Sequence, residues 1–298
     1  MGSVLSGIRS PVRRIADRHP RLRGPIGRCW NTFERARFTF HARRNRRRNA
    51  DEAAAVDPYR LLDLSPQFVE GHSSGRFDSI ADAGRVVDGD WDREGPVTFE
   101  SRVRYPSFRE HFLEGVPWEE TAFYRSKIEK IRSDRPAKYA SVDALDRKCG
   151  ELDRIYEELR TSGYRTQAEI ATAAGSSGTI VGDGGRGVLP WGSKHLVRSE
   201  VAVDVARDGE PMLNEGRHRM CLAKLLALDS IPVRVVVRHR EWQDRRNEVA
   251  DALRNTSPDS RAAAIETVED HLPDDDSIVV GPTHPDLLAI VDDYLEGQ

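Results

Sequence analysis

The clearest hydrophobic pattern in the chain is a helical one over residues 141–161. Ser141 is a favourable N-cap residue and Gly163 a natural C-terminal stop. Between them, apolar residues recur every three or four positions, at Val142, Leu145, Cys149, Leu152, Ile155, Tyr156 and Leu159. This spacing places them on one face and predicts an amphipathic helix. Directly afterwards, Thr166 and Glu169 have the spacing of a capping box and predict a short second helix.

The pattern changes to a period of two at residues 201–205, where valine occupies every second position. Such alternation is typical of a strand. Turn residues and a glycine at 216 then break the chain into short segments. Their order predicts a β-β-α-β unit: a strand at 201–205, a hairpin turn at 207–210, a return strand from 211, a helix at 217–227 and a strand at 231–237.

The flanking segments give weaker patterns. Residues 71–96 are rich in Gly, Ser and Asp and predict a loop with at most a short strand in "GRVVDG". Residues 106–132 predict two helices, the second starting at Pro117, with an apolar stripe that belongs to the core: Trp118, Phe123, Tyr124 and Ile128. After residue 238, the patterns predict mostly polar helices, the last one starting near Pro285.

Charge is distributed unevenly along the chain. Residues 1–50 contain 14 arginines and only two acidic residues, a net charge of +12, whereas the whole chain carries −3. Apolar residues at helical spacing among these arginines predict two short basic amphipathic helices, followed by "HARRNRRRN" at 41–49, which neither helix needs. Three interpretations remain open for this basic arm: a solvated tail, a contact with an anionic membrane surface, and a contact with nucleic acid.

Composition narrows the class of protein. The apolar runs, such as Val235–Val237, are far shorter than the roughly 20 residues that span a bilayer, so we expect no transmembrane segment. No secretory signal pattern follows Met1, and we expect a cytoplasmic protein, with peripheral attachment to a membrane as the variant that the basic arm allows. Three widely spaced cysteines and scattered histidines do not have the spacing of a disulfide framework or a metal site.

The candidate chemistry lies at the start of the predicted helix at 217–227, in the turn Gly216-Arg217-His218-Arg219. A helix N-terminus presents unpaired N–H groups and the positive end of the helix dipole, and glycine lets a ligand approach the backbone. Two guanidinium groups and an imidazole add donors suited to phosphate oxygens. The alternative is that these arginines pair with the protein's own carboxylates, for example Glu215 or Asp208.

The same turn resembles that of the ParB/sulfiredoxin superfamily. ParB-type proteins have G-E-R-R followed by a helix of the form W-R-A-A-K-L-A-G-L, and here the turn leads into "MCLAKLLAL". A second, weaker similarity is "LRTSGYRTQ" at 159–167, which resembles the family's first box. Sulfiredoxins have a reactive cysteine where Arg217 stands, and Cys221 lies on an apolar run typical of the core, so the resemblance does not extend to sulfinic acid repair.

The resemblance implies a nucleotide-binding protein that takes CTP or ATP with Mg²⁺. It implies that Gly216, Arg217, His218 and Arg219 contact the phosphates, and that Gly163, Tyr164 and Gln167 contact the base or ribose. One interpretation is an NTP-dependent phosphotransferase or hydrolase. Such an enzyme needs a carboxylate to orient the acceptor or hold Mg²⁺, and the carboxylates nearest to the turn in sequence are Asp204, Asp208 and Glu215. The alternatives are a ParB-like nucleic-acid-binding or nuclease-like protein, and a non-catalytic protein that interacts with a membrane surface.

Together these patterns predict an α+β fold. A small mixed β-sheet of the ParB/sulfiredoxin type is expected at 141–240, with a basic amphipathic arm at 1–50, a mainly helical region at 51–140 and a polar helical segment at 241–298. The glycine-rich stretch "GSSGTIVGDGGRG" at 175–187 lacks the Walker motif and is expected to be a loop or lid.

Overall fold

The structure, a computed structural model, describes residues 23–73, 76–93, 97–99, 101–133, 139, 141–173, 193–272 and 283–297. The glycine-rich stretch at 175–187 and the first of the two helices expected in the basic arm therefore lie outside the described residues. Among the described residues, no helix combines the length and the apolar character that a bilayer span requires.

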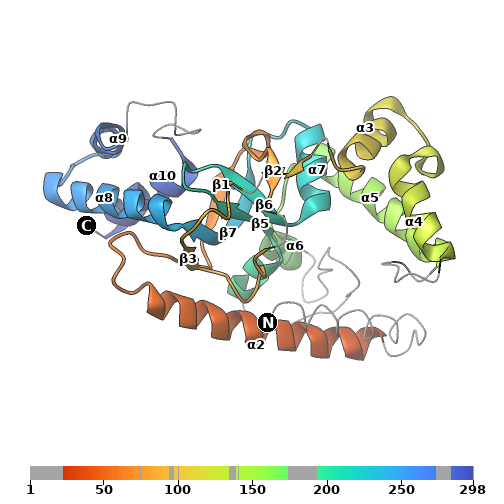
Figure 1. Ribbon diagram of the computed structural model, residues 1–298, viewed down its shortest axis with the longest axis horizontal. Helices are drawn as coiled ribbons and strands as arrows, with labels where there is room; N and C mark the ends of the chain where they lie inside the picture. Colours follow the sequence, from red (N-terminus) through yellow and green to blue (C-terminus); the bar gives the residue numbers. More distant parts are fainter. Residues whose placement is uncertain are drawn as a thin grey trace.

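A mixed β-sheet of seven strands forms the centre of the described structure (Figure 1). Its order is β1-β7-β5-β6-β2-β4, and β3 pairs with the second half of β7. β5 runs parallel to β7 and antiparallel to β6, and β2 runs parallel to β6. The strands are β1 (Leu61–Leu64), β2 (Gly71–His72), β3 (Arg85–Val87), β4 (Val97–Thr98), β5 (Val201–Val205), β6 (Pro211–Glu215) and β7 (Ile231–His239).

The helices surround this sheet in groups (Figure 1). α3, α4 and α5 gather at one end of the molecule, α8, α9 and α10 at the other, and α2 runs along one long side. The helices are α2 (Arg23–Arg48), α3 (Arg104–Glu114), α4 (Ala122–Arg132), α5 (Val142–Ser162), α6 (Gln167–Ala173), α7 (Arg217–Leu225), α8 (Arg240–Thr256), α9 (Arg261–Asp270) and α10 (Pro285–Glu296), with 3₁₀ turns η2 (Pro66–Phe68), η3 (Trp118–Glu120) and η5 (Ser193–Ser199).

The two faces of the central strands belong to different hydrophobic clusters. Val201, Val203 and Val205 of β5 are buried in the main core, which α7 also enters. The alternate residues Ala202 and Ala206 face a smaller cluster that contains Phe77 and Trp91. Both faces are covered, which explains why every residue of β7 except Pro232 is buried, including Arg234 and Arg238.

Most elements with strong local signals are confirmed. α5 begins after Ser141, whose hydroxyl accepts a hydrogen bond from the Ala144 N–H, and α6 has the predicted capping box between Thr166 and Glu169. The β5–β6 hairpin, α7, β7 and the three later helices also form where expected. One boundary differs: α4 is capped by Thr121, while Pro117 precedes the short turn η3.

The segment 51–140, expected to be mainly helical, contains α3 and α4 but also contributes β1, β2, β3 and β4 to the central sheet. Only β3, within "GRVVDG", was expected. These strands have two to four residues, too few to show an alternating pattern. They form because β6 and β7 offer edges for pairing, as when Leu61 to Leu64 pair with the first half of β7.

α2 also differs from the sequence prediction, because it is one helix that continues through the arginine run to Arg48. Phe38, Ala42 and Asn45 are buried, and their spacing places them on one side of the helix. Phe38 and Ala42 pack with Ile80 and Ala83, and the Asn45 amide donates to the carbonyls of Ala81 and Ala83. These contacts keep the arginine run helical, although its local sequence indicated only a polar tail.

The opposite end of the molecule is held by a buried carboxylate. Asp286, at the start of α10, accepts two hydrogen bonds from the Arg238 guanidinium, at 2.8 and 2.6 Å, and one from the Trp242 indole at 2.9 Å. Arg246 is a further ion-pair partner at 3.3 Å. Arg238 lies on β7 and the other two on α8, so one carboxylate joins the sheet to both helices.

Candidate functional site

The turn that opens the candidate site is shaped by Gly216. Its φ of 93° is in the left-handed region, and a Cβ there would lie 3.0 Å from the Cα and from Cγ2 of Val201. Both facts favour glycine. The glycine is thus required by its contact with β5, in addition to any role in ligand approach.

α7 begins immediately after this glycine. The first intrahelical bond is donated by the Met220 N–H to the Gly216 carbonyl at 3.0 Å. The N–H groups of residues 217–219 precede it, and no N-cap side chain accepts from them. The turn therefore presents backbone donors at the positive end of a nine-residue helix.

Four basic side chains from distant parts of the chain lie close to this helix start; we call them the cationic cluster: His72, Arg102, Arg104 and Arg217. They are close enough for the charge of one to shift the pKa of another. Burial and, to a smaller extent, the charges of the three arginines together lower the pKa of His72 to about 4. The pKa of Arg104 is likewise lowered by burial and by its two arginine neighbours.

The cationic cluster has no acidic counterpart among the described residues. No carboxylate there forms an ion pair with any of its three arginines. The Arg104 Nε and the Nδ1 of His72, which is 4% exposed, are buried without a hydrogen-bond partner in the described part of the chain. Concentrated positive charge with unused buried polar atoms is an arrangement that an anion would stabilise.

Arg219 has a different environment from the one expected. Its guanidinium donates to Glu200 at 3.2 Å, to the Tyr164 hydroxyl at 2.9 Å and to the Ser199 carbonyl. Glu200 is 3% exposed and also accepts from the Gln167 N–H at 2.5 Å. Arg219 thus takes the alternative left open by the sequence, pairing with an internal carboxylate, although that carboxylate is neither Glu215 nor Asp208.

This network nevertheless brings together the two segments on which the family resemblance rests. Tyr164 lies in the turn between α5 and α6, Gln167 is the first residue of α6, and Arg219 lies in the first turn of α7. Glu200, just before β5, joins them. Gly163 has a φ of 69° and ends α5 with its N–H bonded to the Leu159 carbonyl, so its observed role is that of a helix cap.

His218 points toward α3. Its imidazole stacks on Phe108 with ring centroids 5.9 Å apart and an interplanar angle of 15°. The turn therefore sends its three side chains in different directions. Arg217 joins the cationic cluster, His218 packs on an aromatic ring and Arg219 reaches Glu200.

The three carboxylate candidates are not gathered at the turn. Asp204 is fully buried on the sheet face opposite α7, where it accepts from the Asn214 amide and where burial raises its pKa to about 6. Asp208 lies at the far end of the β5–β6 hairpin and accepts from the Glu210 N–H. Glu215, exposed beside Gly216, accepts from the Ser79 hydroxyl. Of the three, only Glu215 adjoins the helix start.

Sequence reasoning missed three members of the cationic cluster. His72 lies on β2, whose pairing with β6 brings it beside the turn; Arg104 begins α3, and Arg102 lies two residues before it. No local pattern marks them, because their proximity to Arg217 depends on the strand order. The alternating arginines of "SRVRYPSF" at 101–108 were the only available signal.

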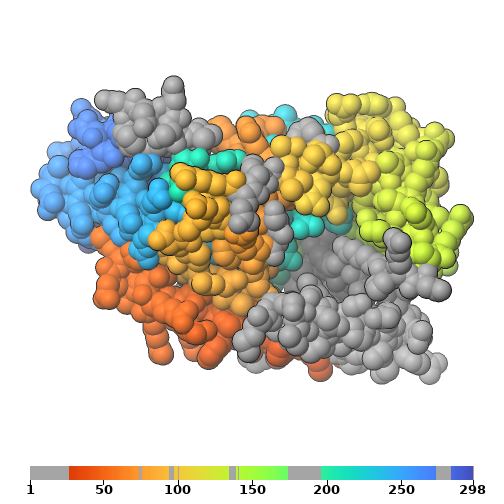
Figure 2. All heavy atoms as spheres, viewed as in Figure 1, coloured from red at the N-terminus to blue at the C-terminus, as the bar shows by residue number. Residues whose placement is uncertain are grey.

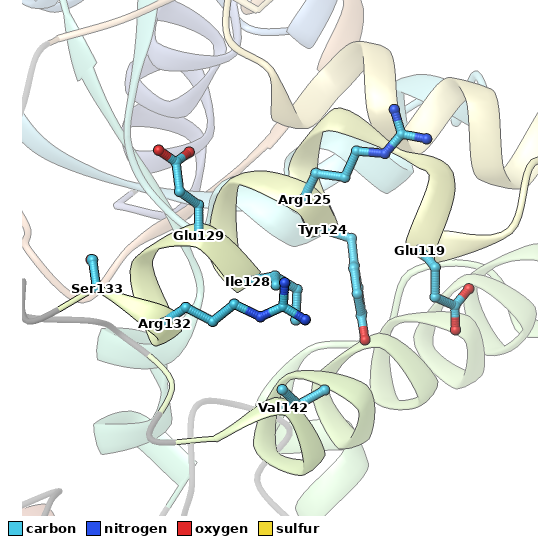
Figure 3. Close-up of a pocket in the computed structure, with 8 residues that line it drawn as sticks. All are labelled: Glu119, Tyr124, Arg125, Ile128, Glu129, Arg132, Ser133 and Val142. Atoms are coloured by element: carbon cyan, nitrogen blue, oxygen red, sulfur yellow. The ribbon is translucent and has the colours of Figure 1, made fainter.

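A separate cavity of about 620 Å³ lies between α4 and the start of α5 (Figure 3). Its lining mixes acidic, basic and apolar side chains, and the Tyr124 hydroxyl at its edge donates to Asp146 at 2.6 Å. None of the residues predicted to bind phosphate or base lines it. The lining consists of Glu119, Tyr124, Arg125, Ile128, Glu129, Arg132, Ser133 and Val142.

No family model, curated protein or solved structure matches the chain. The resemblance to the ParB/sulfiredoxin superfamily therefore rests on two sequence motifs, the turn with its following helix and the segment at 159–167. Among the described residues, no group of His, Cys, Asp and Glu side chains has the arrangement of a metal site.

Proposed function

We propose that the protein binds a phosphorylated ligand, a nucleoside triphosphate such as CTP or ATP, at the N-terminus of α7. The observation that supports this most directly is the cationic cluster, whose three arginines have no carboxylate partner in the described chain. Arginine and helix N-terminal N–H groups both suit phosphate oxygens. Bringing three guanidinium groups together without acidic partners costs folding free energy, which a bound polyanion would offset.

In this proposal Arg217, Arg104 and Arg102 bind the phosphate oxygens directly, together with the backbone N–H groups after Gly216. His72 is neutral at pH 7 and donates or accepts through its unpaired nitrogen, according to its tautomer. Arg219 is a positioning residue, because its guanidinium is held by Glu200 and Tyr164. The base and ribose would lie toward the turn that contains Tyr164 and Gln167.

Phosphoryl transfer or hydrolysis would require a carboxylate and Mg²⁺ near the phosphates. Glu215 is the candidate, since it directly precedes the turn and is exposed. A triphosphate bound by the cationic cluster would itself supply oxygen ligands for Mg²⁺, the usual way in which this ion is held. Binding is the primary proposal, and turnover by Glu215 depends on it.

Isothermal titration calorimetry of the full chain with CTP, ATP and GTP, each with and without Mg²⁺, tests the proposal. We expect saturable binding of at least one nucleotide and a roughly tenfold or larger rise in Kd for Arg217→Ala and for Arg104→Ala, since a hydrogen bond to a charged group contributes about 1.5–3 kcal/mol.

Arg109→Ala is the matched control, because Arg109 lies on the same helix as Arg104 but is exposed and paired with Glu114. It removes the same charge and should leave Kd nearly unchanged. Absence of nucleotide binding, or equal effects of all three variants, would refute the site. Binding to DNA alone, with affinity falling steeply as salt increases, would instead favour the nucleic-acid alternative.

A further inference from the structure

The side of α2 that faces away from the body carries both aromatic and basic side chains. Phe33, Phe40 and Arg47 are spaced seven residues apart, and Arg43 and Arg44 follow Phe40 by three and four. These intervals place all five on one side of the helix. We call them the outer face of α2: Phe33, Phe40, Arg43, Arg44 and Arg47.

The outer face is opposite the side that attaches α2 to the protein. Phe38, Ala42 and Asn45 are buried against the body, as described above. By contrast, Phe40 is 64% exposed and Phe33 47% exposed, the first being the most exposed large apolar side chain in the described structure. Among the described residues, the ring contacts of Phe33 and Phe40 are with Trp30 and His41 of α2 itself, so they do not attach the helix to the body.

Positive charge surrounds the exposed rings. All three arginines of the outer face are exposed, and so are Arg46 and Arg48 on its flanks. Glu34, the one acidic residue within the sequence of α2, is half-buried and faces Arg198 on the body: burial lowers the pKa of the Arg198 guanidinium, and the charge of Glu34 opposes that effect. The outer face is thus aromatic and cationic.

The shape of α2 favours a flat partner. The helix has 26 residues and runs along one long side of the molecule, at its periphery (Figures 1 and 2). A bilayer interface offers anionic headgroups for the arginines and an adjoining apolar layer for the phenyl rings. Duplex nucleic acid offers the phosphates but leaves an exposed phenylalanine without an apolar environment.

We propose that the outer face of α2 binds an anionic lipid surface, with α2 lying in the plane of the interface and Phe33 and Phe40 inserted below the headgroups. This inference does not depend on nucleotide binding at α7. Because α2 already continues as a helix through the arginine run to Arg48, the protein does not have to fold this segment when it binds.

Sedimentation of the full chain with vesicles tests the proposal. We expect binding to vesicles of phosphatidylcholine mixed with phosphatidylglycerol, and little binding to phosphatidylcholine alone. Removing both rings with Phe33→Ala and Phe40→Ala should lower the partition coefficient by roughly tenfold or more, from the lost apolar contact. Replacing Arg44 and Arg47 by glutamine should lower it by a similar factor, at roughly fivefold per charge.

Two double variants elsewhere on the surface serve as matched controls. Phe68→Ala with Leu113→Ala removes two apolar side chains of similar exposure, 45% and 54%. Arg109→Gln with Arg154→Gln removes two exposed charges from other helices. Both should bind vesicles as the parent protein does. Circular dichroism of each variant verifies that a lost interaction is not lost folding.

Insertion is measured directly with Phe40→Trp. The tryptophan emission should shift to shorter wavelength on phosphatidylglycerol vesicles and be quenched by lipids brominated on the acyl chain. The proposal is overturned if the parent protein does not bind these vesicles, if the outer-face variants bind as well as the controls, or if labelled DNA binds while the Phe40→Trp emission stays unchanged with lipid.

Discussion

Replacing Glu200 by glutamine tests whether Arg219 is held by the protein's own network. Glutamine keeps the shape of the side chain and removes the charge. Glu200 accepts from three donors, namely the Gln167 N–H, the Tyr164 hydroxyl and the Arg219 guanidinium. An amide group has one oxygen and one NH₂, so at least one of these donors would face another donor.

The expected cost follows from the burial of the pair. The Glu200 side chain is 1% exposed and that of Arg219 16%. Breaking a fully buried ion pair costs about 3–5 kcal/mol, but glutamine avoids the desolvation of a carboxylate, whose pKa burial raises here, and Arg219 is partly solvated. We therefore expect Glu200→Gln to lower the free energy of unfolding by about 2–3 kcal/mol. For a chain of this size, that corresponds to a fall in Tm of about 3–5 °C.

Urea unfolding followed by far-ultraviolet circular dichroism measures this change, provided that the m-value stays constant. Glu157→Gln is the control, because Glu157 and Arg160 form a pair on α5 with both side chains more than half exposed. Such a pair contributes little to stability. Equal urea midpoints for the two variants would refute the reasoning. Glu200→Gln should also retain nucleotide binding, and its complete loss without a change in stability would show that Glu200 acts on the ligand.

Three further outcomes are expected. Gly216→Ala should lower the free energy of unfolding by about 2–4 kcal/mol, measured by urea unfolding, because its φ is positive and a Cβ would meet the backbone of Val201. The imidazole of His72 should titrate near pH 4 by NMR, and at a higher pH when nucleotide is bound. Because this pKa lies below the ordinary 6.5, the neutral imidazole contributes fully to stability above pH 6.5, and this contribution is lost as the pH falls toward 4. Asp286→Asn should cost about 3–5 kcal/mol in the same unfolding assay, because it leaves Arg238 and Arg246 buried without their carboxylate. Burial raises the pKa of Asp286, but those arginines outweigh it and hold the pKa far below its usual range. The ionised carboxylate therefore contributes to stability above about pH 4, and this contribution is lost at lower pH. If Asp286→Asn left the midpoint of acid unfolding unchanged, this assignment would be wrong.

Elements defined by near neighbours in the chain could be predicted. The period and caps of α5, the capping box of α6, the β5–β6 hairpin and the glycine that starts α7 are all encoded within a few residues. The hydrogen bonds of the helices, caps and hairpin turn close between residues two to five positions apart, and the hairpin strands pair residues no more than 13 apart, so a local pattern is sufficient. Mixed α/β character followed from these elements, and the structure confirms it at that level.

The candidate site could be predicted only in part, for the same reason. The sequence indicated the helix start and Arg217, both of which remain in the site. It could not show that Arg219 would turn to Glu200, since that contact depends on the segment that leads into β5. It assigned Asp204 to the region, but strand alternation places this side chain on the face of the sheet away from α7.

The sequence by itself determined which segments become helices and strands wherever periodicity and caps are strong. Only the tertiary structure decided that short stretches near residues 61, 71, 85 and 97 join the sheet, that α2 continues through the arginine run to Arg48, and that His72, Arg102 and Arg104 lie beside Arg217. The physical reason is the range of the interactions. Backbone hydrogen bonding and side-chain periodicity act over a few residues, whereas edge pairing, burial of one helix face and the convergence of like charges depend on groups that are distant in sequence and become neighbours only when the sheet has formed.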